Sequence, residues 1–356
     1  MKKDGGLTKA VNRFWKHGLA AGTRAAYTRH MRRYRRWCRR HNIDGDGETA
    51  KPSELDLCFF VTSEARRGLQ PGSVKAQLSA IRAGTLANGF GDPCRDDNGG
   101  CLPALQRLVR GISRSTNKAR KLRKPLTVDK LAAAIKFARE ATGSTFNGAA
   151  LKAALSLGVY LLLRVGGLVS PKTTGHNPAK GLNVEDVEFL PSFDNPNRME
   201  VTVKNSKGDP FRNGCVLKVV ANGSDTCPVT LMKRWLVIRG RADGKGALFK
   251  LNSGKLLTRS VLQKWMRSAL TLAGYVGEEH SCHSLRAGGA ESLVATGFDS
   301  SVIQVMGRWQ SNAFLLYLKI SDAVRKEASV AMGKLKKQDF DTLVSRGRNK
   351  DSADWL

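Results

Sequence analysis

Acidic residues are scarce in this sequence relative to basic ones. Thirty aspartates and glutamates stand against sixty lysines and arginines, which gives a formal net charge of +30 over 356 residues. A chain with such an excess of positive charge is expected to bind a polyanion. Nucleic acids and membrane surfaces are both anionic, so charge alone leaves these two partners open.

The sequence also has no long uninterrupted apolar run. Its most apolar stretch, residues 149–169, contains Lys152, Ser156 and Arg164, which indicates a buried helix and not a membrane span. The first fifteen residues, MKKDGGLTKAVNRFW, have no apolar core of the signal-peptide kind. We therefore expect an intracellular protein, in the nucleus if the host is eukaryotic and in the nucleoid or cytoplasm if it is bacterial.

Cysteine patterns and nucleotide-binding motifs are missing too. The seven cysteines are scattered, and Cys94 and Cys101 have no histidine or second cysteine pair at zinc-site spacing, so we expect reduced thiols. The chain has neither a Walker loop nor a carboxylate cluster that could hold two metal ions. We expect no metal and no cofactor.

Helical apolar spacing, in contrast, is abundant in the first ~120 residues. Tyr27, Met31, Tyr34 and Cys38 share one helical face. A second helix is expected after Pro71-Gly72, capped by Ser73, and a third over residues 102–112. We predict an all-helical domain over residues 1–118, a basic linker over 119–126 and a second domain over 127–356.

Arginine is concentrated in residues 23–41. Eight arginines and no acid occupy the helix positions there that the apolar residues leave open. Like charges one helical turn apart repel unless an anion lies against them, so we expect phosphate contact here and not merely a solvated face. The candidate DNA-binding residues are Arg24, Arg29, Arg32, Arg33, Arg36 and Arg40, with Lys121, Arg123 and Lys124 of the linker.

The second domain is predicted to be α+β and mostly helical. Thr127 is expected to cap its first helix, and the buried helix of residues 149–169 follows. Residues 199–203 then alternate in polarity, a turn-rich stretch intervenes, and residues 216–220 resume the alternation, which indicates a β-hairpin. The helical period returns from Leu231 onward.

Four basic residues of this domain could bind one phosphate. Arg164 has no carboxylate within four residues, so it needs an anion or several backbone carbonyls. Lys207 lies in the hairpin turn, where most lysines are merely solvated. His283 and Arg286 lie where a helix should begin and free backbone N–H groups favour an anion. The small residues 287–289 would let another backbone or a ligand approach closely.

Two aromatic residues follow this histidine–arginine pair. Trp309 could simply pack in a core, and Tyr317 could be a buried tyrosine that bonds through its hydroxyl. Of the five tyrosines in the chain, however, only Tyr317 lies downstream of the pair. This makes it the candidate nucleophile if the site performs covalent chemistry.

The order Arg, Lys, His-x-x-Arg, Trp, Tyr resembles that of the tyrosine recombinases, the phage-integrase and Cre type. The likeness covers nearly the whole chain, from a basic helical N-terminal domain through a linker to a catalytic domain with a nucleophilic tyrosine. The segments SKGDPFRNG, HSLRAGGA and GRWQSNAFLLYL are especially similar to versions carried by mobile elements of the Crypton and DIRS kinds. The resemblance implies a mainly α fold with a helical core-binding domain.

The resemblance also implies an activity. Tyr317 would attack a DNA phosphodiester, form a 3′-phosphotyrosyl bond and release a 5′-hydroxyl, in the integration or excision of a mobile element. Neither ATP nor a metal is needed, because the covalent bond conserves the energy of the phosphodiester. The implied partners are double-stranded DNA sites and other copies of the chain, in a homotetramer on DNA.

Each remaining site residue takes a role from the family. Arg164 and Arg286 would offset the charge of the pentavalent transition state. His283 would act as a base or as a donor to the phosphate, and Lys207 would be the general acid for the 5′-oxygen. Trp309, where many relatives have histidine, would donate its indole N–H to the phosphate.

One position departs from the family pattern. The family usually has a carboxylate three residues after the first arginine, and this chain has Gly167. Because that acid helps to hold the arginine, the alternative function is a catalytically inactive, recombinase-derived DNA-binding protein. The joint presence of Lys207, His283 and Tyr317 favours the enzyme.

Two further alternatives remain open. Residues 288–310 could form a helix-turn-helix reader of DNA, with Gly297 ending one helix and Ser300 or Ser301 beginning the next. A type IB topoisomerase shares the tyrosine chemistry, although the compact N-terminal domain favours site-specific recombination.

Overall fold

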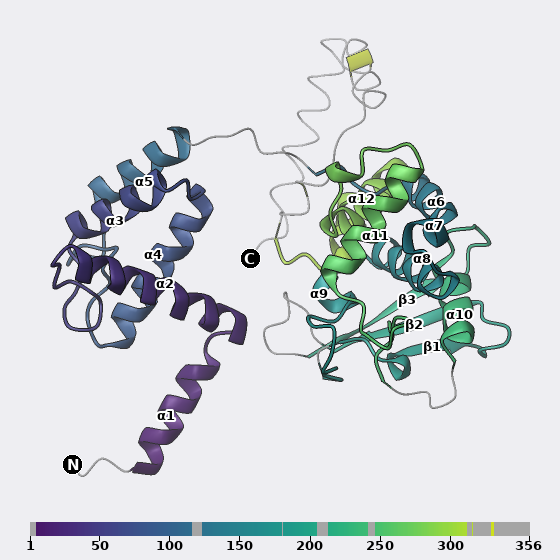
Figure 1. The fold of residues 1–356 in the computed structure, drawn as a ribbon, viewed down its shortest axis with the longest axis horizontal. Helices are drawn as coiled ribbons and strands as arrows, with labels where there is room; N and C mark the ends of the chain where they lie inside the picture. The colour runs from purple at the N-terminus through teal and green to yellow at the C-terminus, as the bar shows by residue number, and fades with distance from the viewer. Residues whose placement is uncertain are drawn as a thin grey trace, which may run out of the picture. The chain divides into compact units, whose positions relative to one another are not determined.

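The computed structural model describes residues 5–115, 123–179, 181–204, 213–240 and 246–311, together with residues 315 and 329–330. The chain divides into two compact units, residues 1–121 and 122–356, each with its own hydrophobic core (Figure 1). None of the helices in these described ranges is long and apolar enough to cross a membrane.

The described part of the first unit is all-helical, as the sequence predicts, and contains five helices where the sequence located three. Helix α2 packs against α4, and α3 packs against both α4 and α5. The helices are α1 (Gly5–His17), α2 (Ala21–Arg40), α3 (Glu54–Arg66), α4 (Pro71–Ala87) and α5 (Pro103–Ser115).

The apolar face expected on α2 forms part of this unit's core. Met31, Tyr34 and Cys38 are buried there, and the Tyr34 hydroxyl donates to the Gly45 carbonyl at 2.7 Å. The prediction that Ser73 caps α4 is wrong. The helix begins two residues earlier at Pro71, whose fixed φ and missing N–H suit the first helical position.

The second unit is mostly helical with a small sheet. Its first helix, α6, begins after Thr127 as expected, although the Thr127 side chain makes no capping hydrogen bond. The helices are α6 (Val128–Lys136), α7 (Ala138–Thr142), α8 (Thr145–Tyr160), α9 (Val165–Leu168), α10 (Pro228–Arg239), α11 (Arg259–Leu272), α12 (His283–Ala295) and α13 (Ser300–Gly307).

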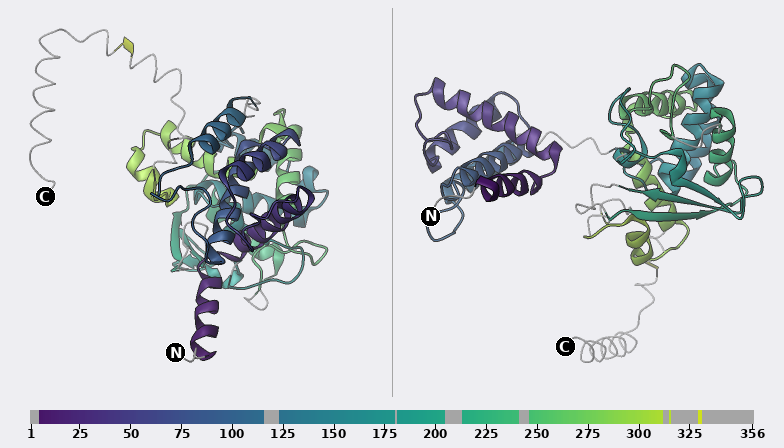
Figure 2. Two further views of the ribbon diagram at one scale, coloured as in Figure 1. Left: turned by 90° about the vertical axis from the view of Figure 1, so that its left-hand side faces the viewer. Right: turned by 90° about the horizontal axis from the view of Figure 1, so that it is seen from below.

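Three antiparallel strands form the sheet in the order β1-β2-β3, and the sheet lies at one side of the helices (Figures 1 and 2). The predicted hairpin corresponds to β2 (Arg198–Val203) and β3 (Cys215–Val220), in which Val201 pairs with Leu217. The four-residue strand β1 (Val187–Leu190) pairs with β2 and was not predicted. The burial of alternate residues in β2 confirms the alternation that the sequence shows.

Helix α8 is the centre of this unit, and it packs against α6, α7, α10, α11 and α12. Two glycines of α12 allow the close approach of other backbone segments. A Cβ at Gly288 would overlap the Leu126 carbonyl, and a Cβ at Gly289 would overlap the Val159 carbonyl. The small residues after Arg286 therefore serve backbone packing, one of the two uses that the sequence suggests.

We expect Gly288→Ala to destabilise the second unit by at least about 2 kcal/mol, because the clash is with backbone and cannot be relieved by a rotamer change. Urea unfolding followed by circular dichroism would measure the loss. The matched control is Gly166→Ala, where an added Cβ meets nothing within 4 Å and the change should stay within about 1 kcal/mol. Equal stability of Gly288→Ala and wild type would contradict this packing.

Candidate active site

Arg286 lies in the first turn of α12, at the helix start that the sequence predicts, and its side chain is 1% exposed. The guanidinium donates to the carbonyl of Leu162 at 2.8 Å and to the carbonyl of Gly307. A buried charge without polar partners is very costly, and these carbonyls offset part of that cost. They also fix the orientation of the guanidinium before any ligand arrives.

Trp309 covers the same guanidinium. The Cζ atom of Arg286 lies 4.0 Å from the centroid of the Trp309 ring, a cation–π contact. The indole also packs in a small apolar cluster with Leu162, Ala290 and Ile303. Trp309 therefore combines core packing with a direct contact to the candidate phosphate-binding arginine.

His283 is the first residue of α12, and its side chain reaches solvent. Partial burial lowers the pKa of His283, and the positive charges of Arg286, Arg259 and Arg164 lower it further. An imidazole whose pKa lies below 6.5 is neutral at physiological pH. His283 can then accept a proton from a neighbouring hydroxyl.

Arg164 precedes α9, where it occupies the N-cap position with an extended backbone. The buried helix α8 ends earlier than expected, at Tyr160, and a turn that includes Leu162 in a left-handed conformation leads to Arg164. Its electrostatic effect on His283 places Arg164 in the same cluster of cations. The Gly167 N–H donates to the Arg164 carbonyl at 2.8 Å, and this position supplies no carboxylate.

Arg259 belongs to this cluster and was missed by the sequence analysis. It is the first residue of α11, and its carbonyl accepts a hydrogen bond from the Cys282 thiol at 3.5 Å, next to the start of α12. The Ser170 N–H bonds the Leu257 carbonyl at 3.0 Å, so the segment after α9 also lies beside the start of α11. The helix start after Thr258 was a readable signal, but no spacing in the sequence connects it to His283.

We expect the His283 pKa to rise toward 6.5 in Arg259→Gln, because that change removes one of the positive charges that lower it. An NMR titration of the ring C–H signals would measure the shift. The matched control is Arg267→Gln in the same helix, since Arg267 pairs with Glu278 at 2.7 Å. An unchanged His283 pKa in Arg259→Gln, or an equal change in Arg267→Gln, would contradict the proximity of Arg259 to His283.

Three of the predicted site residues lie outside the described residues. They are Lys207, Tyr317 and Lys121. The structure thus brings together Arg164, His283, Arg286 and Trp309, and the roles of Lys207 and Tyr317 rest on the sequence.

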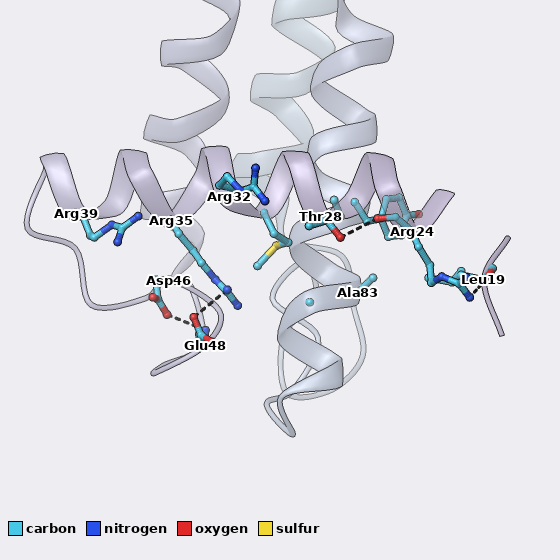
Figure 3. Close-up of a pocket in the computed structure, with 13 residues that line it drawn as sticks. Leu19, Arg24, Thr28, Arg32, Arg35, Arg39, Asp46, Glu48 and Ala83 are labelled. Carbon is cyan, nitrogen blue, oxygen red and sulfur yellow. Dashed lines mark hydrogen bonds and ion pairs between the residues drawn. The ribbon is translucent and has the colours of Figure 1, made fainter. Parts of the chain in front are cut away.

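The predicted arginines of α2 lie on two faces of the helix. Arg24 and Arg32, with Arg35 and Arg39, line a hollow of about 620 Å³ beside α4, and Figure 3 shows the labelled arginines along α2. Glu48 pairs with Arg35 at 2.9 Å. This hollow is therefore basic but not free of acids.

A second hollow, of about 690 Å³, lies on the other face of α2. It is lined by Arg33, Arg36 and Arg40 and by Arg66 and Arg67 from the end of α3. The last two arginines were missed, because they are adjacent to the others only in the folded unit.

Arg33 has a carboxylate partner within the protein. The buried Glu64 accepts from Arg33 at 2.7 Å and also from Gln77 at 2.8 Å. An acid from α3 thus relieves part of the charge repulsion on α2, while Arg29 is exposed to solvent.

The two predicted linker residues that the structure describes belong to the second unit and contact other residues of it. Arg123 donates to the Glu278 carbonyl, and Lys124 pairs with the Glu279 carboxylate at 2.5 Å. These contacts tie the segment before α6 to the residues that precede α12.

Helices α12 and α13 have the helix boundaries that the helix-turn-helix alternative expects. Gly297 is left-handed after α12, and α13 begins at Ser300. The exposed residues of α13, however, include the apolar Val302, Val305 and Met306. Apolar side chains can contact only the thymine methyl in the major groove, so most of this exposed face offers no hydrogen bond for base readout.

Comparison with known proteins identifies the fold. No protein-family profile matches the sequence, and no curated protein sequence matches it. Solved structures do match, and they are tyrosine recombinases and integrases. The chain therefore has the fold of the tyrosine recombinases.

Three of these structures indicate how far the likeness extends. The Tn1549 transposon integrase in complex with transposon right end DNA is 14% identical, with a TM-score of 0.57 over 91% of this chain and 98% of that chain. The XerH recombinase in a post-cleavage complex with difH is 18% identical, with a TM-score of 0.54 over 80% and 73%. A lambda integrase dimer on a COC′ core site is 15% identical, with a TM-score of 0.50 over 89% and 82%.

Proposed function

We propose that this chain is a site-specific DNA recombinase that cleaves and rejoins DNA through a 3′-phosphotyrosyl intermediate. The observation that carries the proposal is the buried Arg286, fixed by two carbonyls and an indole beside a histidine of lowered pKa. Such preorganised positive charge is what a transition state with additional negative charge on phosphate requires. The recombinase fold supports the same reaction.

In the proposed first step, the Tyr317 oxygen attacks the scissile phosphorus while its proton passes to His283. The new bond joins phosphorus to the tyrosine oxygen, and the bond from phosphorus to the 5′-oxygen breaks. Lys207 protonates the departing 5′-oxygen. Attack by a 5′-hydroxyl from another strand reverses the step and reseals the DNA. Arg164 and Arg286 stabilise the phosphate oxygens throughout.

DNA binding follows from charge in both units. Lys and Arg neutralise phosphates and release counterions, so affinity should fall steeply with salt. The arginines of the two α2 hollows and Arg123 and Lys124 are the proposed contacts. The similarity of the motif sequences to those of mobile elements supports a role in mobile-element integration or excision. The proposed active form is a homotetramer on DNA inside the cell.

The test is a search for a covalent protein–DNA adduct. Wild-type protein is incubated in EDTA with nicked duplexes that include the ends of its own element, and SDS-resistant complexes are counted and sequenced. We expect adducts at one defined sequence, joined to the 3′-phosphate. Tight binding without any adduct on those duplexes would instead establish the inactive DNA-binding protein that Gly167 suggests.

A further inference from the structure

Two non-glycine residues of the second unit are left-handed among those described, Leu162 with φ of 49° and Arg308 with φ of 54°. This conformation is uncommon for bulky side chains and costs free energy, so it persists only where the surrounding structure imposes it. The two residues lie in different segments, one after α8 and one after α13. They nevertheless meet at Arg286.

Both left-handed turns direct a carbonyl to the Arg286 guanidinium. The Leu162 carbonyl accepts one guanidinium N–H at 2.8 Å, and the Gly307 carbonyl accepts another. Both residues take the left-handed position that ends a helix in a Schellman motif. The Leu163 N–H donates to the Gly158 carbonyl at 3.1 Å, and the Trp309 N–H donates to the Gln304 carbonyl at 3.1 Å.

The Arg308 side chain then holds the other turn in place. Its Nη2 lies 3.3 Å from the Leu161 carbonyl and 3.4 Å from the Leu162 carbonyl, so Leu162 accepts from both arginines. Its Nη1 lies 3.5 Å from the sulfur of Cys215, the first residue of β3. Arg308 thus connects the α8–α9 turn, the end of α13 and the predicted hairpin.

The neighbours of Arg308 close around the same guanidinium. A Cβ at Gly307 would overlap the Trp309 ring, so glycine is required for the ring to stack on Arg286. Residues 307–309 therefore supply a carbonyl, a left-handed turn and an aromatic face to one arginine.

We propose that Arg308 is a positioning residue that fixes the catalytic Arg286 through the Leu162 and Gly307 carbonyls. The inference rests on the proposed recombinase function for its catalytic consequence. Arg308 acts on the backbone that holds Arg286, and the phosphate contact belongs to Arg286 itself. The left-handed backbone of Arg308 belongs to the end of α13, so the positioning role rests on the Arg308 side chain.

The test compares Arg308→Gly and Arg308→Lys with wild type. Glycine accepts the left-handed backbone without strain but has no guanidinium, so the relief of strain should offset part of the lost hydrogen bonds and the melting temperature should fall by no more than about 5 °C. At saturating DNA, we expect the single-turnover rate of adduct formation to fall by about ten- to a hundredfold in Arg308→Gly, because the arginine loses its fixed orientation. Arg308→Lys should restore part of the rate. The affinity of Arg308→Gly for DNA should fall by less than about threefold, the effect expected for the loss of one positive charge.

A second readout needs no catalysis. The charge of Arg286 lowers the His283 pKa, so a displaced guanidinium should move that pKa toward 6.5 in an NMR titration of DNA-free Arg308→Gly. Asn42→Gly, which relieves a left-handed residue in the other unit, is the control and should change neither quantity.

The possible failures can be told apart. Absence of adduct with wild type would overturn the recombinase function. The His283 titration would still test whether Arg308 fixes the position of Arg286. An Arg308→Gly protein with the wild-type cleavage rate and the wild-type His283 pKa would overturn the positioning role. Weaker DNA binding with an unchanged rate at saturation would make Arg308 a direct DNA contact and also overturn it.

Discussion

The Tyr317→Phe variant is expected to form no covalent adduct with DNA while binding the same duplex as tightly as wild type. Phenylalanine keeps the ring but removes the hydroxyl oxygen that attacks phosphorus, and loss of a nucleophile can lower a rate by about a millionfold. The assay counts SDS-resistant complexes on the element's own ends, and a gel-shift titration measures binding. Binding should persist because the proposed DNA contacts lie in the arginine-rich surfaces.

The control for this experiment is Tyr275→Phe. Tyr275 belongs to the same unit, where it packs against the core, and it lies upstream of the His283–Arg286 pair. This variant should form as much adduct as wild type. Adducts that persist in Tyr317→Phe would show that another residue attacks the phosphate and that the motif assignment is wrong.

The helices and strands were predictable wherever the apolar residues recur at a clear helical or strand spacing. Helix α2 shows its buried face directly in the spacing of Met31, Tyr34 and Cys38, and β2 shows its pleat in Met199, Val201 and Val203. Strand β1 spans four residues and has too few positions to show alternation. The start of α4 was misplaced because Pro71 and Ser73 are both helix-start signals. In the structure the helix begins at Pro71.

The candidate site was predictable in its residue types but not in its support. The start of α12 placed His283 and Arg286 correctly, and the following glycines indicated a close approach. The carbonyls that hold Arg286 come from a leucine and a glycine, residues that carry no chemical signal in a sequence. Leu162 is left-handed without being glycine, so the sequence offers no reason to expect a sharp turn there.

The arginines of α2 and α3, the candidate DNA-binding surface, show the same limit in terms of charge. Eight arginines on one helix predict a polyanion partner, but Glu64 and Glu48 reach α2 from other segments and pair with Arg33 and Arg35. Because such pairs form only on folding, a charge count along one helix overestimates the charge available to phosphate. Arg66, at the end of α3, adds charge from outside the stretch, while Arg67 also pairs with Glu64 at 3.2 Å.

The Arg286→Lys variant is expected to form the covalent adduct about a hundred- to a thousandfold more slowly than wild type, the usual cost of removing one preorganised donor to a transition-state oxygen. Lysine keeps the charge but loses the planar fork, so it cannot bond two carbonyls and a phosphate oxygen in fixed directions. Stability should also fall, by about 1–3 kcal/mol, because the Leu162 and Gly307 carbonyls lose a donor. Single-turnover cleavage at saturating DNA and urea unfolding measure the two effects.

Arg267→Lys separates the two effects. Arg267 also holds a carbonyl, that of His280 at 2.9 Å, and pairs with Glu278, but the proposed mechanism gives it no phosphate contact. We expect it to lose stability and to cleave at the wild-type rate. If Arg286→Lys lost stability but cleaved normally, Arg286 would be a structural arginine of the same kind as Arg267. The charge that stabilises the transition state would then have to come from Arg164 and Arg259, which also lower the pKa of His283.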